Sequence, residues 1–164
     1  MFERDIISQL AAWKTDTNRK PLVVHGARQV GKTWTLKYFG REYFDDVAYF
    51  SLDKDESGLC DVFRTTKDPQ RIIQHLSFLH GKKIEPQTTL LILDEIQECN
   101  EALNALKYFC EEAPEYAVAC AGSLLGIYLN HVGKSFPVGK VNHLYMYPLT
   151  FTEFLRTKDP VMHE

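Results

Sequence analysis

Residues 26–33 read Gly-Ala-Arg-Gln-Val-Gly-Lys-Thr and match the spacing G-x-x-x-x-G-K-[ST]. An apolar segment precedes them and a helical pattern follows. Glycines let successive backbone N–H groups converge on an anion, and the helix N-terminus adds a partial positive charge. A lysine here can reach the β- and γ-phosphates of a nucleotide, and a hydroxyl can ligate Mg²⁺. The pattern therefore predicts an ATP–Mg²⁺ site whose binding residues are Gly26, Ala27, Arg28, Gln29, Val30, Gly31, Lys32, Thr33 and Trp34.

A pair of carboxylates follows a second apolar segment. Four apolar residues, 90–93, lead into Asp94 and Glu95, the pattern of a Walker B strand. At the carboxyl edge of a parallel sheet, Asp94 is expected beside the magnesium. Glu95 is expected to orient the attacking water, for which a P-loop kinase has little use. The pair favours hydrolysis over phosphoryl transfer to a metabolite.

Two polar residues are candidates for contact with the γ-phosphate or the water. Ser123 ends an apolar segment, where it is either a sensor of the γ-phosphate or the N-cap of a following helix. Gln97 either touches the water or faces solvent. The catalytic set predicted from the sequence is therefore Glu95, Lys32 and Ser123, with Thr33 and Asp94 at the metal.

The sequence says less about which nucleotide base is bound and about which side chain supplies a second cation to the phosphates. A guanine site needs [NT]-K-x-D, and both Thr-Lys-Asp runs, at 66–68 and 157–159, place the aspartate one position early, so adenine is favoured. Segment 131–140 is either a solvated hairpin or a source of a cation, Lys140, acting in cis or on a neighbouring subunit. Arg28 is the other candidate cation. A histidine-based metal site is not predicted, because the histidines lack ligand spacing.

Strand and helix patterns alternate along the chain, which predicts an α/β fold with a parallel sheet. An amphipathic helix is expected at the N-terminus, with apolar Phe2, Ile6, Leu10 and Trp13 on one face. Strands are expected over 22–24, 47–52, 90–93 and 116–121, and a strand or hairpin arm over 138–147. Helices are expected over 32–39 with Gly40 as C-cap, from Pro69 to Gly81, through Leu103, Leu106 and Phe109, and after Thr150 with Glu153 as a capping box.

Composition excludes several classes of protein. The 164 residues carry 19 basic and 22 acidic side chains, a net charge of −3, so bulk charge does not support nucleic-acid binding. No segment has the roughly 18 apolar residues of a membrane span, and no signal peptide is seen. The four cysteines, 60, 99, 110 and 120, form no C-x-x-C pair and are expected to be reduced thiols in a cytoplasmic protein.

The motifs at 26–33, 93–97, 121–123 and 147–155 together resemble a family of prokaryotic AAA-like ATPases. The resemblance implies a three-layer P-loop NTPase fold with a sheet of about five strands ordered 5-1-4-3-2. It also implies that residues 1–164 form one ATPase domain. By the same resemblance, residues 1–164 are expected to lack the family's lid and C-terminal domain, and Gly139 is followed by Lys140 where many relatives carry an arginine.

We therefore expect an ATP-binding protein that hydrolyses ATP with Mg²⁺ and couples hydrolysis to a conformational change. The alternative is a nucleotide-dependent switch or scaffold with negligible turnover, because the sequence shows no clear arginine finger. A metabolite kinase is the least favoured choice. The expected partners are ATP and ADP, together with a second copy of the chain or another protein if a cation is supplied in trans.

Overall fold

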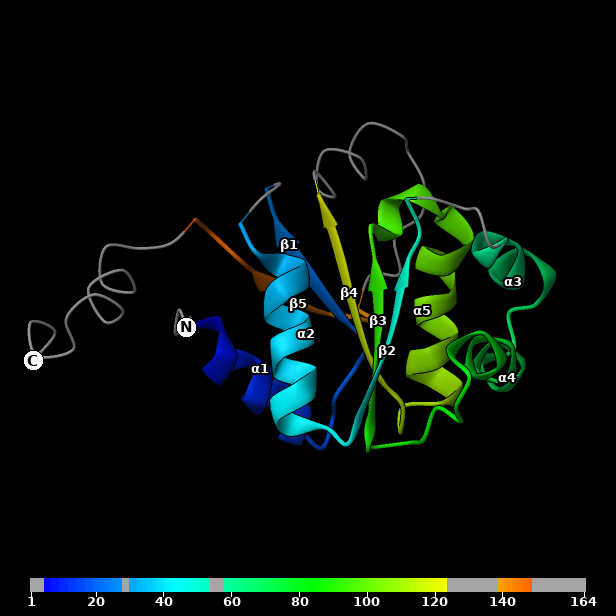
Figure 1. The fold of residues 1–164 in the computed structure, drawn as a ribbon, viewed down its shortest axis with the longest axis horizontal. Helices are drawn as coiled ribbons and strands as arrows, with labels where there is room; N and C mark the ends of the chain where they lie inside the picture. The colour runs from blue at the N-terminus through cyan, green and yellow to red at the C-terminus, as the bar shows by residue number, and fades with distance from the viewer. Residues whose placement is uncertain (1–4, 28–29, 54–57, 124–138, 149–164) are drawn as a thin grey trace, which may run out of the picture.

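The computed structural model describes residues 5–27, 30–53, 58–123 and 139–148, and its centre is one five-stranded sheet (Figure 1). The strands lie in the order β2-β3-β4-β1-β5, and every neighbouring pair is parallel. Read from the other edge, this is the predicted order 5-1-4-3-2. The strands are β1 (Leu22–Gly26), β2 (Asp46–Ser51), β3 (Thr89–Asp94), β4 (Ala117–Ser123) and β5 (Asn142–Tyr145).

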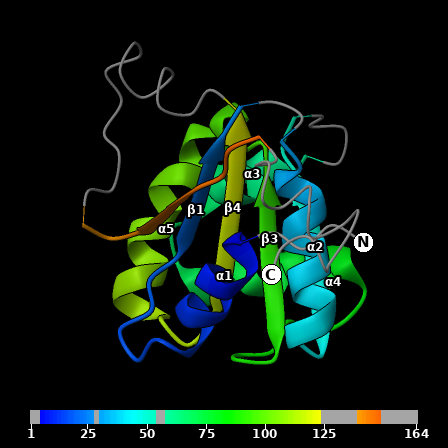
Figure 2. The same ribbon diagram turned by 90° about the vertical axis from the view of Figure 1, so that its left-hand side faces the viewer.

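Helices cover both faces of the sheet and make three layers (Figure 1). On one face lie α1 (Ile6–Thr15) and α2 (Lys32–Tyr43). The other face carries α5 (Asn100–Glu112), against which α3 (Leu59–Thr65) and α4 (Pro69–His80) pack. A view turned by 90° shows α1 in front of the sheet and α5 behind it (Figure 2). The α/β fold class and the three layers are therefore confirmed.

The strands divide their side chains between two cores, because successive residues of a strand face opposite sides. On β3, Leu91 and Leu93 join the core under α3–α5, whereas Leu90 and Ile92 join the core under α1 and α2. All residues of β3 and β4 are buried. This explains why these segments are apolar without alternation, as is usual for a central parallel strand.

The helix boundaries follow local signals, with one exception. Asp68 caps α4 by accepting a hydrogen bond from the backbone N–H of Gln70, and Gly81 ends α4 in the left-handed conformation, as predicted. The prediction that Gly40 ends α2 is wrong, because the helix continues to Tyr43. A Cβ on Gly40 would lie 2.5 Å from a methyl carbon of Val47. Gly40 is therefore needed for close packing of α2 on β2.

Two of the four cysteines are not free thiols. Cys60, in the first turn of α3, forms a disulfide with Cys99, which directly precedes α5. The prediction of reduced thiols is therefore wrong for this pair, while Cys110 and Cys120 are free. The two bonded cysteines are 39 residues apart, and α3, which brings them together, carries no strong sequence signal.

The C-terminal part of the chain is described only in part. Segment 142–145 is a strand that pairs in parallel with β1, which confirms the strand within the predicted 138–147 segment. The helix expected after Thr150 lies outside the described residues. None of the described helices is long and apolar enough to cross a membrane.

Candidate functional site

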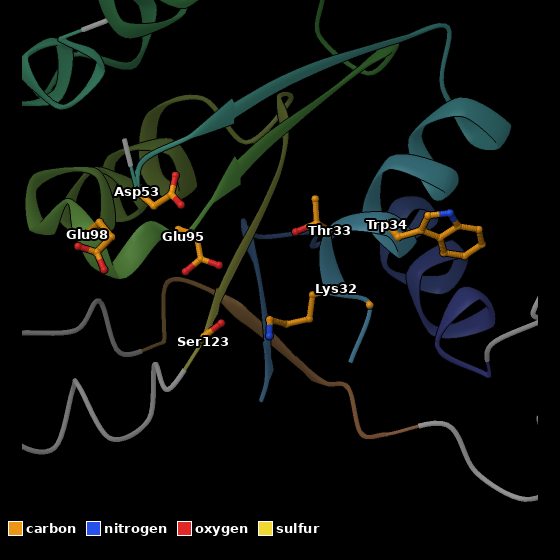
Figure 3. Close-up of a pocket in the computed structure, with 8 residues that line it drawn as sticks. Lys32, Thr33, Trp34, Asp53, Glu95, Glu98 and Ser123 are labelled. Carbon is orange, nitrogen blue, oxygen red and sulfur yellow. The ribbon is translucent and has the colours of Figure 1, made fainter. Parts of the chain in front are cut away.

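A cavity of about 520 Å³ opens where the carboxyl ends of β3 and β4 meet the N-terminus of α2. This is the edge at which parallel α/β sheets bind ligands. Figure 3 shows the side chains of Lys32, Glu95 and Ser123 pointing toward one common space. The residues that line the cavity are Gly31, Lys32, Thr33, Trp34, Asp53, Glu95, Glu98 and Ser123.

Gly31 and Lys32 shape the predicted loop in different ways. Gly31 is the N-cap of α2 and has φ 89°, a left-handed conformation that favours glycine. The buried Lys32 ammonium donates hydrogen bonds of 2.7 Å to the carbonyls of Gly26 and Ala27. Burial lowers the pKa of Lys32, and the nearby Glu95 and Asp94 oppose that shift. The ammonium is thus folded back onto the loop, within reach of the cavity.

Asp94 is the most heavily bonded carboxylate of the site. It is 4% exposed, and its Oδ2 accepts hydrogen bonds of 2.6 Å from the hydroxyls of Thr33 and Tyr49. Its Oδ1 accepts a third, from the backbone N–H of Glu95. Burial and the neighbouring Asp94 raise the pKa of the Tyr49 hydroxyl. The Thr33 and Asp94 oxygens are adjacent hard donors, the type that Mg²⁺ prefers.

Glu95 begins a turn of 3₁₀ helix, η2 (Ile96–Glu98). Its φ of 52° is unusual for a residue with a side chain. The Glu95 carboxylate accepts a 2.6 Å hydrogen bond from the side-chain amide of Gln97. The structure thus brings the Gln97 amide to the Glu95 carboxylate, a contact that the sequence did not predict.

Ser123 lies where the sequence placed it, at the end of β4, and is 5% exposed. Its neighbour in the sheet is Gly26, at the end of β1. Asp53 and Glu98 also line the cavity, and neither was among the site residues predicted from the sequence. The position of Asp53 two residues after the end of a strand adjacent to β3 was the available signal.

The remaining residues of the loop contribute differently. Trp34 lines the cavity and is 45% exposed, but its ring stacks on Tyr38 and points away from Lys32 and Glu95 (Figure 3). Val30 is buried in the core under α2. Arg28 and Gln29 lie outside the described residues.

Met146 covers the loop from the β5 side. Its backbone N–H donates a 2.8 Å hydrogen bond to the carbonyl of His25, at the end of β1. A Cβ on Gly26 would lie 2.6 Å from the Met146 carbonyl oxygen, and one on Gly31 would lie 3.6 Å from its side-chain methyl. Gly26 therefore also allows the backbone after β5 to approach the loop, whereas a Cβ on Gly31 would make only an ordinary contact with Met146.

Lys140 lies far from the cavity. It precedes β5, whose first residue, Asn142, is paired with Leu22 at the start of β1, whereas the loop follows the end of β1. At about 3.3 Å per strand residue, this separates Lys140 from the cavity by more than the length of β1. Its ammonium instead lies 3.2 Å from a carboxylate oxygen of Glu111. The alternative in which Lys140 supplies a cation in cis therefore does not fit this conformation.

Comparison with known proteins agrees with this arrangement. A family model described as an AAA domain matches residues 18–155. No curated protein matches the sequence. A Walker-type ATPase of Pyrococcus abyssi superposes with a TM-score of 0.60 at 18% identity, covering 99% of this chain and 59% of that one. The Orc1 protein of Aeropyrum pernix, in complex with DNA, superposes with a TM-score of 0.54 at 14% identity, covering 93% of this chain and 45% of that one.

These likenesses carry different weights. At such low identity the two solved structures show the fold alone, and this chain spans only about half of their length. The family model covers most of the chain and supports an ATPase-like, nucleotide-binding function. With the phosphate-loop sequence, the 5-1-4-3-2 sheet and the family match together, the chain belongs to the AAA-domain family.

Proposed function

We propose that this chain binds ATP with Mg²⁺ and hydrolyses it to ADP and phosphate. The observation that carries the proposal is the 2.6 Å contact between Thr33 and Asp94, beside a cavity that Lys32 and Glu95 also line. Two oxygen donors for a metal, a cation for phosphate and a second carboxylate thus surround one space. Adenine is proposed as the base because a guanine-specific motif was not found in the sequence.

The residues of 26–34 are proposed to bind the nucleotide. The backbone N–H groups of the loop and the N-terminus of α2 would hold the phosphates. Lys32 would exchange its bonds to the Gly26 and Ala27 carbonyls for phosphate oxygens. When bound by Thr33 and Asp94, Mg²⁺ would neutralise charge on the β- and γ-phosphates. Trp34 would contribute through its place in the first turn of α2, because its ring points away from Lys32 and Glu95.

Glu95 is proposed to orient the attacking water and to accept its proton. The water oxygen bonds to the γ-phosphorus, the bond from phosphorus to the β–γ bridging oxygen breaks, and ADP leaves. Lys32 and the loop N–H groups stabilise the charge of the transition state. Ser123, at the end of β4, would contact the γ-phosphate.

The test is phosphate release from ATP with Mg²⁺, together with calorimetric ATP binding, for wild type and Glu95→Gln. Loss of a general base costs about 10²–10⁴-fold in rate, so Glu95→Gln should bind ATP as wild type does and turn over far more slowly. Glu112→Gln, at the exposed end of α5, is the matched control and should behave as wild type. Equal turnover by Glu95→Gln and wild type would contradict the role of Glu95.

A nucleotide-dependent switch is the second candidate, and one observation favours it. Lys32 is the sole cationic side chain among the described residues that line the cavity. Absence of an arginine finger can cost about 10³–10⁵-fold in rate. Wild type that binds ATP without releasing phosphate would identify this alternative, and restored turnover on adding a partner would show that the cation comes in trans.

We further propose that residues 1–164 form one ATPase domain whose hydrolysis drives a conformational change. A second copy or another protein would be its partner. We propose a cytoplasmic location. The Cys60–Cys99 disulfide argues against it, because such bonds are rare in that compartment.

A further inference from the structure

The side chain of Gln97 lies between Glu95, which follows β3, and Gly122 of β4. On one side its Nε2 donates the 2.6 Å hydrogen bond to Oε2 of Glu95. The other side of the same amide faces β4. An amide is uncharged, so this contact holds the carboxylate without cancelling its negative charge. A lysine or arginine in the same place would cancel it.

Strand β4 is shaped around the Gln97 amide. A Cβ on Gly122 would lie 2.4 Å from Oε1 of Gln97, closer than any side chain permits. Gly122 directly precedes Ser123, which lines the cavity. The glycine at this position of a buried strand is thus explained by the amide that occupies the space of its side chain.

The orientation of the amide follows from its partner. A carboxylate only accepts hydrogen bonds, so the NH₂ group faces Glu95 and Oε1 is left against Gly122. Within the described part of the chain, that buried oxygen has no hydrogen-bond partner. Buried polar atoms are nearly always hydrogen-bonded. The unbonded Oε1 therefore indicates that the amide is held here by the bond from its NH₂ group to Glu95.

The backbone at Glu95 is constrained as well. Its left-handed φ of 52° is disfavoured for a residue with a side chain and persists only when neighbours enforce it. The N–H of Glu95 is bonded to Asp94, and its carboxylate is bonded to Gln97. Both ends of the residue are therefore fixed, and Oε1 of Glu95 is the carboxylate oxygen that the Gln97 bond leaves available to the cavity.

We propose that Gln97 is a positioning residue that fixes the Glu95 carboxylate for orientation of the water, and that Gly122 supplies the space this requires. The inference rests on the proposed hydrolysis. It differs from direct contact between Gln97 and the water, because Gln97 acts only through Glu95. Substitution of Gln97 should therefore lower kcat and leave ATP binding unchanged.

The test compares kcat, KM and calorimetric ATP binding of wild type, Gln97→Leu and Gly122→Ala. Loss of a residue that orients a metal ligand typically costs about 10–100-fold in activity. By analogy, kcat of Gln97→Leu should fall by that factor, with binding within about twofold. Gly122→Ala should lower kcat similarly, because the added methyl displaces the amide. Gln74→Leu, on the exposed face of α4, is the matched control and should keep wild-type values.

A double substitution separates positioning from a structural role. In a Glu95→Gln background, adding Gln97→Leu should lower the residual kcat no further, because the carboxylate it orients is gone. A further fall in that background, weakened ATP binding in Gln97→Leu, or an unchanged kcat in Gln97→Leu would each overturn the assignment of Gln97 alone. Wild type that binds ATP but releases no phosphate would instead overturn the proposed hydrolysis, and this assignment with it.

Discussion

The hydroxyl of Thr33 donates a 2.6 Å hydrogen bond to the carboxylate of Asp94, although the two residues are 61 positions apart in the chain. One stands in the first turn of α2 and the other at the end of β3. Their contact joins the phosphate-loop motif to the second carboxylate motif. It therefore turns two sequence patterns into one set of oxygen donors.

Thr33→Val should weaken Mg²⁺-dependent ATP binding. Valine keeps the shape of threonine but removes the oxygen, and loss of a bond to a charged group costs about 1.5–3 kcal/mol, or roughly 10- to 100-fold in Kd. Calorimetry with Mg²⁺ measures the effect, and titration in chelator is the control, where variant and wild type should bind alike. An equal loss with and without Mg²⁺ would point to a damaged loop rather than a lost metal ligand.

Tyr49→Phe should lower activity without unfolding the protein. The Tyr49 hydroxyl donates to the same Asp94 oxygen as Thr33, at 2.6 Å, and phenylalanine removes only that hydroxyl. Loss of a hydrogen bond that orients a metal-binding carboxylate typically costs about 10–100-fold in metal affinity or activity. The Mg²⁺ concentration for half-maximal turnover should rise in the variant. Tyr108→Phe, on α5, serves as the matched control, and an unchanged Mg²⁺ requirement in Tyr49→Phe would contradict the prediction.

Reduction of the Cys60–Cys99 disulfide should lower the free energy of unfolding. The bond closes a loop of 39 residues in sequence, and such a cross-link typically contributes about 2–4 kcal/mol by restricting the unfolded chain. Urea unfolding with and without reductant measures the difference. Cys60→Ser/Cys99→Ser should unfold like the reduced protein under both conditions, and Cys110→Ser should remain sensitive to reductant. If alkylation of the unreduced protein labels all four cysteines, the bond is absent.

Stability should fall between about pH 6.5 and pH 4 because of His25. Burial, and secondarily the charge of His143, lowers the pKa of His25 from 6.5 to about 4. In this window the unfolded chain binds a proton that the folded chain does not, so protonation favours unfolding as the pH falls. Urea midpoints at about pH 7.5 and about pH 5 test this, and His25→Asn should show a smaller difference between them. Identical pH dependence in variant and wild type would exclude His25 as the cause.

Much of the fold could be predicted because its signals are local. The apolar segments of β3 and β4 are buried on both faces, and a segment of this kind is recognisable without any knowledge of its neighbours. Asp68 and Gly81 mark the ends of α4 by hydrogen bonding and backbone conformation within a few residues. The sheet order came from the family resemblance, not from the segments themselves.

The errors concern contacts between distant segments. Gly40 looks like a helix end until β2 packs against it, and Cys60 meets Cys99 only after α3 has docked beside α5. The bond from Tyr49 to Asp94 depends on the β2–β3 register, in which Tyr49 lies opposite Ile92. The alternative of Lys140 as a cation in cis stayed open because the sequence does not reveal at which end of the sheet β5 begins. In each case the missing information was tertiary.

Met146, directly after β5, is in contact with the backbone of the phosphate loop. Its N–H is bonded to the residue before the loop, and its carbonyl lies where a side chain on Gly26 would stand. A rearrangement of the loop at Gly26 would therefore displace the backbone of Met146, which follows β5. Met146 therefore links the loop to the end of β5, so a shift of the backbone at Gly26 would be transmitted to the edge strand of the sheet.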